Sequence, residues 1–448
     1  MWFAHIEARV DIILPWTLVL AYYDINDWLL HSNYAPQRIA QLLRVWNSGA
    51  RIVDIVRKTF LKLQELPIGK PDRGIQACPD STLAVTRPWY LQIESVVFYS
   101  KFAIKHIPYD KRGAIIHQRL DHFKYICVMD YSRYESSHKF HNMVGCELSF
   151  YKKFLPSDIY EQVEYLHKNL VANNPYCSFE SRNGIRASGD GDTSLGNTYT
   201  NIMLADFVFH LCGIEWDGFF EGDDNVVGFD CADIDSFMEQ FRIITRLLGY
   251  EVKLERRESI LDSRFLSTYY GSEACWQDPE SVLMRLNASF KVYYNPTLEK
   301  DLFNSKYLSA YLNNKDAPII GPLCFKNLDH RRKYIIPDSG QTSTWYREKI
   351  DSQNEYLRTH KLTCNVSMQT RAEYAEVTGI SPSEQIFCEQ SFEKLRCIFG
   401  EGQELYECAP YFQVAGVDTI AIPNEIVRYS EVNKLRMHFP RFFEAADA

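Results

Sequence analysis

The stretch Phe219-Phe-Glu-Gly-Asp-Asp-Asn-Val-Val227 predicts the central element of the fold. Its two apolar ends, Phe219-Phe220 and Val226-Val227, flank a polar segment that contains one glycine. Short runs of strand-forming residues on both sides of such a turn are typical of a β-hairpin. We therefore expect a hairpin whose turn displays the carboxylates of Asp223 and Asp224.

A further carboxylate stands at the end of an upstream strand. Residues Tyr125-Ile-Cys-Val-Met129 form an uninterrupted apolar run, which is typical of a buried strand, and Asp130 follows them directly. A sheet that contains this strand and the hairpin brings Asp130 beside Asp223. Phosphoryl transfer by two metal ions needs such a pair, because hard cations about 4 Å apart are held by carboxylates from different backbone segments. The pattern thus predicts two Mg²⁺ ions, with Mn²⁺ as a substitute.

A helix is expected directly before the hairpin. The loop Ser188-Gly-Asp-Gly-Asp192 runs into a helix-like segment from Thr193 to about Cys212. Within it, Asn197 and Asn201 follow Thr193 at intervals of four residues, so these three polar side chains share one face.

A second helix is expected after the hairpin. Ser236-Phe-Met-Glu239 has the pattern of a capping box, and an apolar stripe from Phe237 to Leu248 ends at Gly249. The alternation in Tyr250–Leu254 then predicts a half-buried strand. Further elements are expected elsewhere: an extended segment over 66–80, a helix within 89–105, a helix over 156–172 capped by Ser157 and Asp158, and a hairpin that begins within 264–270.

Length and composition indicate a globular protein of several subdomains. The chain has 448 residues, 46% hydrophobic and 24% charged, with a net charge of −9. That charge argues against a surface that binds nucleic acid all round, but it leaves room for a locally basic channel. The twelve cysteines lack zinc-site spacing and are expected to be reduced thiols in a cytosolic compartment. The apolar stretch 12–23 is too short to span a bilayer, so no membrane anchor is expected.

Four motifs occur in one order along the chain: Lys70-Pro71 with Arg73-Gly-Ile-Gln76, Asp130-Tyr-Ser-Arg-Tyr-Glu135, Ser188-Gly-Asp-Gly-Asp-Thr-Ser-Leu-Gly-Asn197, and Gly222-Asp-Asp224. Their sequence and order resemble the motifs of RNA-dependent RNA polymerases of positive-strand RNA viruses, closest to the tombusvirus-like group. The resemblance covers about residues 68–290. Its most specific part is the third motif, which fits Ser-Gly-x-x-x-Thr-x-x-x-Asn.

The resemblance implies a role for each matching residue. Asp130 and Asp223 would hold the metal ions, with Asp224 in support, and Lys253 would donate a proton to the leaving pyrophosphate. Because Asn both donates and accepts hydrogen bonds, it suits recognition of a 2′-hydroxyl. Nucleotide-binding roles fall to six residues: Lys70 and Arg73 at the triphosphate, and Glu135, Ser188, Thr193 and Asn197 around the sugar.

One residue departs from the family pattern. The family usually has Asp five positions after the first metal-binding Asp, whereas this chain has Glu135. Glu is one methylene longer, so its contact with the ribose needs a shifted backbone or another partner. His138 also lies one position later than the family's histidine.

The implied fold is α+β, a right hand of fingers, palm and thumb, in which an antiparallel palm sheet is backed by the Thr193 and Ser236 helices. The expected divisions are an N-terminal segment with fingers at 1–120, a palm at 121–285 with a fingers insertion at about 150–180, and a thumb at 286–448. The basic cluster His330–Lys333 would lie in the thumb as an RNA contact or a surface patch.

The implied function is template-directed addition of ribonucleoside triphosphates to an RNA 3′ end in viral genome replication and transcription. Its partners would be single-stranded RNA template, nascent RNA, ribonucleoside triphosphates and other viral replicase proteins. Membrane-bound replication sites would be reached through another protein or domain.

Three alternatives remain at this point. A reverse transcriptase would use the same metal chemistry, although Asn197 and the Ser188 loop argue against it. A catalytically inert RNA-binding scaffold gains support only from Glu135, and a calcium-binding protein lacks the loop spacing. Taken singly, Asp190 and Asp192 could be turn formers and Lys253 a solvated surface residue, and Asp233 and Asp235 are expected at the start of a helix.

Overall fold

The computed structural model describes residues 1–15, 24–30, 32, 34, 36–61, 74–173, 178–286, 299–328, 359 and 361–398. The chain divides into two compact units. Unit 1 comprises residues 1–108 and 118–259, and unit 2 comprises residues 109–117 and 260–448. The division into 1–120, 121–285 and 286–448 stays a prediction.

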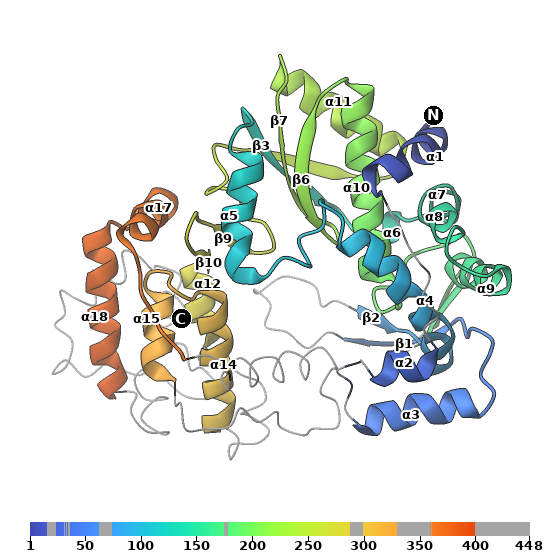
Figure 1. Ribbon diagram of the computed structural model, residues 1–448, viewed down its shortest axis with the longest axis horizontal. Helices are drawn as coiled ribbons and strands as arrows, with labels where there is room; N and C mark the ends of the chain where they lie inside the picture. The colour runs from blue at the N-terminus through green and yellow to red at the C-terminus, as the bar shows by residue number, and fades with distance from the viewer. Residues whose placement is uncertain are drawn as a thin grey trace. The chain divides into compact units, whose positions relative to one another are not determined.

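The central sheet of unit 1 has four strands in the order β6-β7-β3-β8, all antiparallel (Figure 1). These are β3 (Tyr125–Tyr131), β6 (Trp216–Glu221), β7 (Asp224–Phe229) and β8 (Val252–Arg257). The predicted hairpin is β6 and β7, and the predicted half-buried strand is β8, whose side chains alternate between buried and exposed. Both predictions are confirmed.

One face of this sheet carries the main core of unit 1. Cys127, Met129 and Tyr131 of β3 lie in that core, whereas Asp130 between them is exposed. Helices α10 (Thr193–Leu211) and α11 (Ile234–Leu247) cover this face. The predicted helix over 193–212 is therefore confirmed, and the sheet is backed by the two helices expected from the sequence.

At the start of α11, the expected helix-start residues Asp233 and Asp235 are confirmed, but the predicted capping box is not. Its N-cap is Asp233, whose carboxylate accepts hydrogen bonds from the backbone N–H groups of Asp235 and Ser236, both at 3.1 Å. Ser236 is already inside the first turn, so the predicted capping box is wrong. An Asp three residues earlier serves as a better acceptor for the free N–H groups. The end at Gly249 is confirmed by its φ of 88°.

A second sheet of unit 1 has the order β2-β1-β4-β5, with β1 and β4 parallel. Its strands are β1 (Val56–Leu61), β2 (Gly74–Ala77), β4 (Leu170–Asn173) and β5 (Ser178–Ser181). The predicted helix over 156–172 is shorter, α9 (Ser157–Lys168), because β4 begins at Leu170. Its N-cap is Pro156 and no side chain caps it, so the predicted caps Ser157 and Asp158 are wrong.

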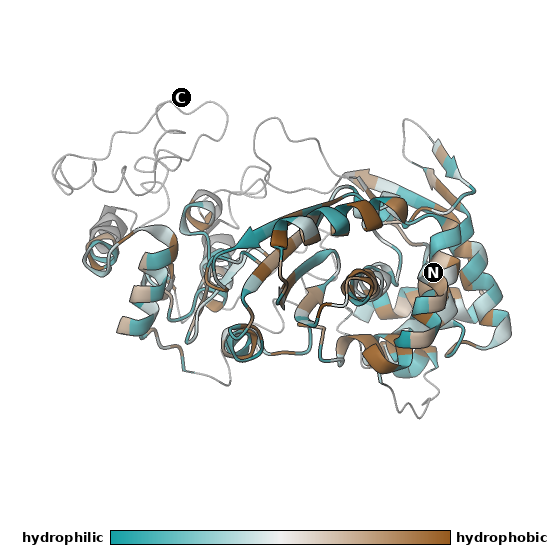
Figure 2. Ribbon diagram, turned by 90° about the horizontal axis from the view of Figure 1, so that it is seen from above, coloured by the Kyte–Doolittle hydropathy of each residue, from teal (hydrophilic) through white to brown (hydrophobic). Residues whose placement is uncertain are grey.

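The remaining helices of unit 1 surround these sheets. Helix α4 (Asp80–Phe98) starts earlier than predicted and includes Pro88. Its side chains Ala84, Val85 and Ile93 are buried, which stabilises this longer helix. Helix α11, for example, buries Ile234, Phe237 and Phe241 and exposes Asp235 and Glu239, and other helices likewise carry both hydrophobic and hydrophilic residues (Figure 2). The others are α1 (Trp2–Ile13), α2 (Ile25–Leu30), α3 (Pro36–Asn47), α6 (Tyr134–Ser137), α7 (Phe140–Met143), the π-helix Val144–Leu148 and α8 (Ser149–Tyr151).

Unit 2 is mainly helical around its own apolar core. The predicted hairpin is confirmed as β9 (Thr268–Tyr270) paired with β10 (Cys275–Gln277). Its helices are α12 (Pro279–Leu286), α14 (Glu299–Asn313), α15 (Ile320–Asn327), α17 (Met368–Thr378) and α18 (Pro382–Ile398), and α5 (Tyr109–Leu120) begins in this unit. Within the described ranges, no helix has the length and apolar character needed to cross a membrane.

Candidate active site

The turn between β6 and β7 is held by helix α10. The strand register pairs Glu221 with Asp224, so Gly222 and Asp223 form a two-residue loop. Gly222 has a φ of 65°, which glycine adopts without strain at the first position of such a loop. The Asn201 side-chain amide donates to the carbonyls of Gly222 at 3.1 Å and Asp223 at 3.0 Å. The position of Asp223 is thus fixed from the helix.

A buried asparagine joins this turn to strand β3. The side-chain Oδ1 of Asn225 accepts from the backbone N–H of Met129 at 3.0 Å, and its Nδ2 donates to Asn201 Oδ1 at 3.3 Å. Strand β3 pairs with β7 up to Cys127 and Val227. The same antiparallel register, continued beyond this pair, would place Asp130 opposite Asp224, and Asp130 lies on the face away from the core.

The carboxylates at this edge of the sheet repel one another. The pKa of Asp224 rises to about 6 through partial removal from water and through the charges of Asp223, Asp130 and Glu221. Because the Asp224 side chain remains exposed, we give more weight to the neighbouring charges than to burial. A bound divalent cation would relieve this repulsion.

Oxygen ligands of this kind fit Mg²⁺ or Mn²⁺. Among the described residues, no three His, Cys, Asp or Glu side chains are arranged to hold one ion by themselves. Magnesium is commonly held by only one or two carboxylates, with water and substrate phosphates completing its coordination. The carboxylate edge therefore fits metal ions that are bound together with a nucleotide.

Lys253 lies beside the carboxylates. It pairs with Asp130 across β3 and β8, which places the two side chains on the same face of the sheet. The Lys253 ammonium forms an ion pair with Glu255 of its own strand, and 71% of the Lys253 side chain is exposed. The residue is therefore near the predicted metal site while its charge is directed toward another partner.

Two of the predicted nucleotide-binding residues, Glu135 and Asn197, are in contact. The Asn197 amide donates to Glu135 Oε1 at 3.4 Å, and Tyr134 Oη donates to the Asn197 carbonyl at 3.4 Å. Glu135 follows Arg133, whose left-handed conformation (φ 52°) turns the chain after β3. The carboxylate of Glu135 thus contacts the Asn197 side chain directly.

The loop that contains Ser188 is attached to strand β2. Ser188 Oγ donates to Gln76 Oε1 at 3.0 Å, and the Cys78 N–H donates to the Gly189 carbonyl at 3.2 Å. A Cβ on Gly189 would lie 2.4 Å from the Gln76 carbonyl oxygen, so this approach requires glycine. Thr193 Oγ1 donates to the Ala187 carbonyl at 2.6 Å, which stabilises the loop.

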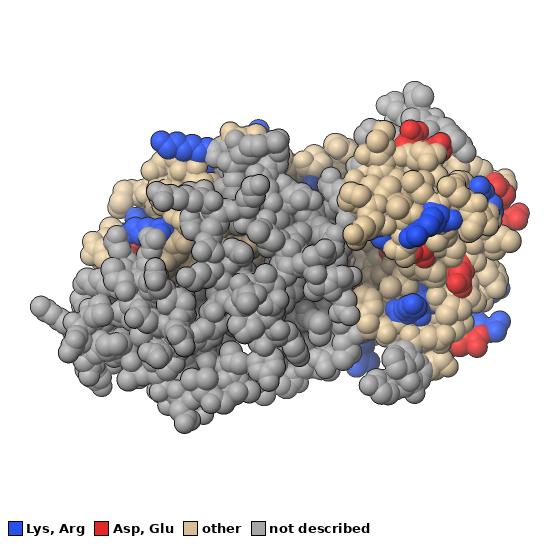
Figure 3. All heavy atoms as spheres, turned by 90° about the horizontal axis from the view of Figure 1, so that it is seen from below, with Lys and Arg blue, Asp and Glu red and all other residues tan. Residues whose placement is uncertain are grey.

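Several predicted residues lie outside the described part of the chain. Lys70 and Arg73 belong to the segment 62–73 between β1 and β2, and the cluster His330–Lys333 follows α15. Their roles stay predictions. On the face shown in Figure 3, the described Lys, Arg, Asp and Glu residues are interspersed.

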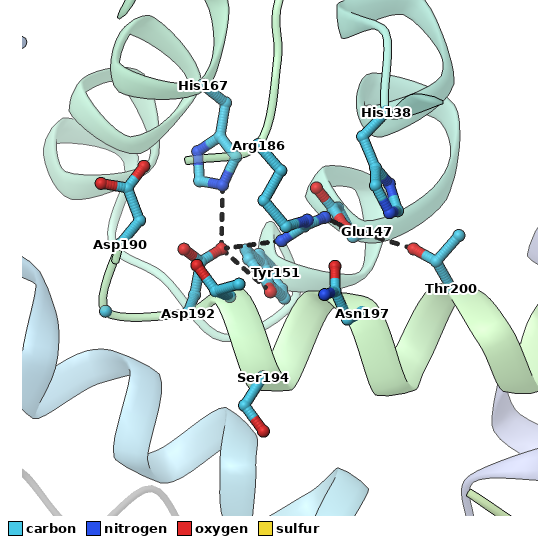
Figure 4. Close-up of polar contacts among 12 residues, drawn as sticks. His138, Glu147, Tyr151, His167, Arg186, Asp190, Asp192, Ser194, Asn197 and Thr200 are labelled. Atoms are coloured by element: carbon cyan, nitrogen blue, oxygen red, sulfur yellow. Dashed lines mark hydrogen bonds and ion pairs between the residues drawn. The ribbon is translucent and has the colours of Figure 1, made fainter. Parts of the chain in front are cut away.

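The sequence analysis did not predict a buried ionic network that involves the Ser188–Asp192 loop (Figure 4). Asp190 receives two hydrogen bonds from the Arg57 guanidinium, at 2.9 and 3.1 Å. Asp192 lies 2.8 Å from His167 Nε2 and 3.7 Å from Arg186 Nη1. The two aspartates are thus charged partners as well as loop residues. No sequence signal links Asp190 and Asp192 to their cationic partners, because Arg57, His167 and Arg186 belong to other segments of the chain.

The network also includes Glu147 and Tyr151. Arg186 forms an ion pair with Glu147, and Tyr151 Oη donates to Asp192 at 3.2 Å. Burial alone would lower the pKa of His167, but the Asp192 carboxylate raises it to about 9. His167 is therefore cationic at neutral pH, and the pKa of Asp192 is correspondingly lowered.

These features define a class of protein. An antiparallel sheet with carboxylates at one edge and two helices on its back is the palm of the right-hand polymerase fold. The sequence model of the family described as viral RNA dependent RNA polymerase matches residues 83–265, which include the carboxylate edge. No curated protein matches the chain significantly in sequence.

Solved structures give the more particular comparison. The RNA-dependent RNA polymerase of a human picobirnavirus, in its insertion-loop deletion mutant, matches with a TM-score of 0.52 and 16% identity over 67% of this chain. The polymerase without that deletion matches with a TM-score of 0.50 and 16% identity over 68% of this chain. This chain covers 62% and 61% of their lengths. The right-hand fold of viral RNA polymerases is thereby confirmed, while the tombusvirus-like grouping stays a prediction.

Proposed function

We propose that this chain is a viral RNA-directed RNA polymerase, a nucleotidyltransferase that adds ribonucleotides to an RNA 3′ end as directed by a template. The observation that supports this most is the meeting of Asp130, Asp223 and Asp224 at one edge of the sheet, where their charges raise the pKa of Asp224. The family match over 83–265 supports the same chemistry.

The residues take distinct roles in this proposal. Asp130 and Asp223 hold two Mg²⁺ ions, for which Mn²⁺ can substitute, and Asp224 supports them. When bound, the ions supply activation of the primer 3′-hydroxyl and neutralisation of the triphosphate. Lys253 donates a proton to the pyrophosphate after leaving Glu255. Lys70 and Arg73 bind the triphosphate as a point charge and a planar fork.

Sugar recognition is assigned to the pair Glu135 and Asn197, with Ser188 and Thr193 in the adjoining loop. The amide of Asn197 is engaged by Glu135, and its Oδ1 has no hydrogen-bond partner among the described residues. This oxygen is buried, so we propose that nucleotide binding moves the Asn197 side chain until Oδ1 accepts a hydrogen bond from the 2′-hydroxyl. A deoxynucleotide would leave it unpaired, which disfavours that substrate.

The partners in this proposal are single-stranded RNA template, nascent RNA, ribonucleoside triphosphates and other viral replicase proteins. The proposed location is the host cell cytoplasm, at membrane-bound replication sites reached through another protein or domain.

The test measures incorporation of labelled ribonucleotides on a primed single-stranded RNA with Mg²⁺. We expect template-dependent extension by the wild type and a loss of about a thousandfold or more in Asp223→Ala, because one metal ligand is gone. The matched control is Asp235→Ala, an exposed acid in the first turn of α11, which should extend normally.

Other outcomes identify the alternatives. A folded wild-type protein that binds RNA but extends nothing with Mg²⁺ or Mn²⁺ would indicate an inert scaffold. The same reaction is run in parallel with deoxynucleotides, and their efficient use would indicate a reverse transcriptase.

A further inference from the structure

The guanidinium of Arg186 is enclosed beneath helix α10. Only 1% of its side chain is exposed, and the paired Glu147 side chain is fully buried. A Cβ on Gly196 would lie 2.1 Å from Arg186 Nη1, so the guanidinium occupies the space left by that glycine. Arg186 therefore packs against the helix one residue before Asn197.

The same residue also holds the partner of Asn197. The Arg186 backbone N–H donates to the Glu135 carbonyl at 3.3 Å. Arg186 thus binds the backbone of Glu135 and packs against Gly196, the residue that precedes Asn197.

Glu147 fixes the guanidinium from the other side. It lies in the π-helix Val144–Leu148. Such helices are rare in proteins, and many of those that occur are at functional sites. Its carboxylate also accepts from Thr200 Oγ1 at 3.2 Å. Arg186 and Glu147 thereby run along α10 between Asp192 and Thr200, and the Asn197 side chain stands on this side of the helix, whereas Ser194 points away (Figure 4).

Buried ion pairs are weak evidence for stability, because desolvation offsets much of their attraction. Within the described residues, Arg186 Nε and Nη1 also lack hydrogen-bond partners, although Nη1 lies 3.7 Å from Asp192 Oδ2. Apolar side chains would fill this space at no such cost, so a fixed geometry is the property that the arrangement supplies.

We propose that Arg186 is a positioning residue for sugar selection: held by Glu147, it sets the distance and orientation of Glu135 relative to Asn197. This inference rests on the proposed function. Loss of the Arg186 contacts therefore reduces discrimination between ribonucleotides and deoxynucleotides more than it reduces extension itself.

The experiment compares kcat/KM for GTP and dGTP on one primed template, using the full chain. Arg186→Gln removes the charge, and Arg186→Lys keeps it without the planar fork. Gly196→Ala keeps every charge but displaces the guanidinium, while alanine favours the helix. We expect Arg186→Gln and Gly196→Ala to lower the GTP to dGTP ratio by about tenfold, with Arg186→Lys intermediate.

The control is Arg9→Gln, because Arg9 forms a bidentate pair with the buried Asp206 of the same helix. It should lower the melting temperature and leave the ratio within about twofold of the wild type. An unchanged ratio in folded Arg186→Gln and Gly196→Ala, or an equal fall in Arg9→Gln, would overturn the inference.

Calorimetric dissociation constants for GTP and dGTP with Mg²⁺ give the corresponding ratio of binding affinities, which does not depend on extension. A wild type that extends no primer would count against the proposed function. The binding ratio in the variants would still decide the role of Arg186.

Discussion

Two uncharged residues, Asn201 and Asn225, hold the backbone segments that carry Asp130, Asp223 and Asp224 close together. Asn225 joins strand β3 to the hairpin, and Asn201 holds the turn that carries Asp223. These amides satisfy backbone groups that burial would otherwise leave unpaired, which costs about 1–3 kcal/mol each. The carboxylates can therefore stay close in spite of their repulsion.

This repulsion makes metal binding depend on pH. The pKa of Asp224 is raised to about 6, so this group is protonated below that pH and ionised above it. A metal ion needs the ionised form, and the metal-free ionised cluster is destabilised by its own charges. We expect Mg²⁺ to raise the melting temperature more at pH 7.5 than at pH 5.5.

Melting curves with and without Mg²⁺ at the two pH values check this prediction. Asp224→Asn should show a smaller difference between the two pH values, because the titrating group is gone. An equal Mg²⁺ effect at both pH values in the wild type would contradict it.

At the scale of elements, two helices have ends that differ from the sequence prediction: α11 in its capping residue and α9 in its C-terminal end. The pattern Ser236–Glu239 predicted a capping box, yet Asp233 accepts the two N–H bonds. Both residues are capable N-caps, and the path of the chain out of β7 selects between them. The bounds of α9 changed for a related reason, since pairing of Leu170 in β4 ends the helix.

The cap of α11 is directly testable. Asp233→Ala should lower the free energy of unfolding by about 1 kcal/mol, because two N–H groups lose their acceptor. Ser236→Ala should change it by less than about 0.5 kcal/mol. Denaturant titration of both variants decides, and the reverse order would restore the predicted capping box.

At the scale of the molecule, segments far apart in sequence build the core of unit 1. Helix α1 lies on α10, where His5 and Arg9 both contact Asp206. Trp2 is 6% exposed, and its ring lies edge-on to Phe207 with centroids 5.0 Å apart. The first helix is thus part of the same core as the palm sheet.

Truncation of this contact measures its contribution. Trp2→Ala should lower the free energy of unfolding by about 3–5 kcal/mol, since a large buried side chain leaves a cavity. Ile12→Ala on the same helix, where Ile12 is 64% exposed, should cost less than about 0.5 kcal/mol. Equal effects in thermal or denaturant unfolding would show that α1 does not depend on its buried face.

The sequence by itself determined the elements whose signals are local. The hairpin, strand β3 and helices α10 and α11 follow from apolar periodicity and turn residues, and motif order indicated the polymerase fold. The sequence also predicted that Asp130 lies beside Asp223, but only the tertiary structure decided the other long-range contacts of the site. The pairing of Asp192 with His167, of Arg186 with Glu147 and of Glu135 with Asn197 depends on strand register and helix packing, because such contacts join residues that no local pattern relates.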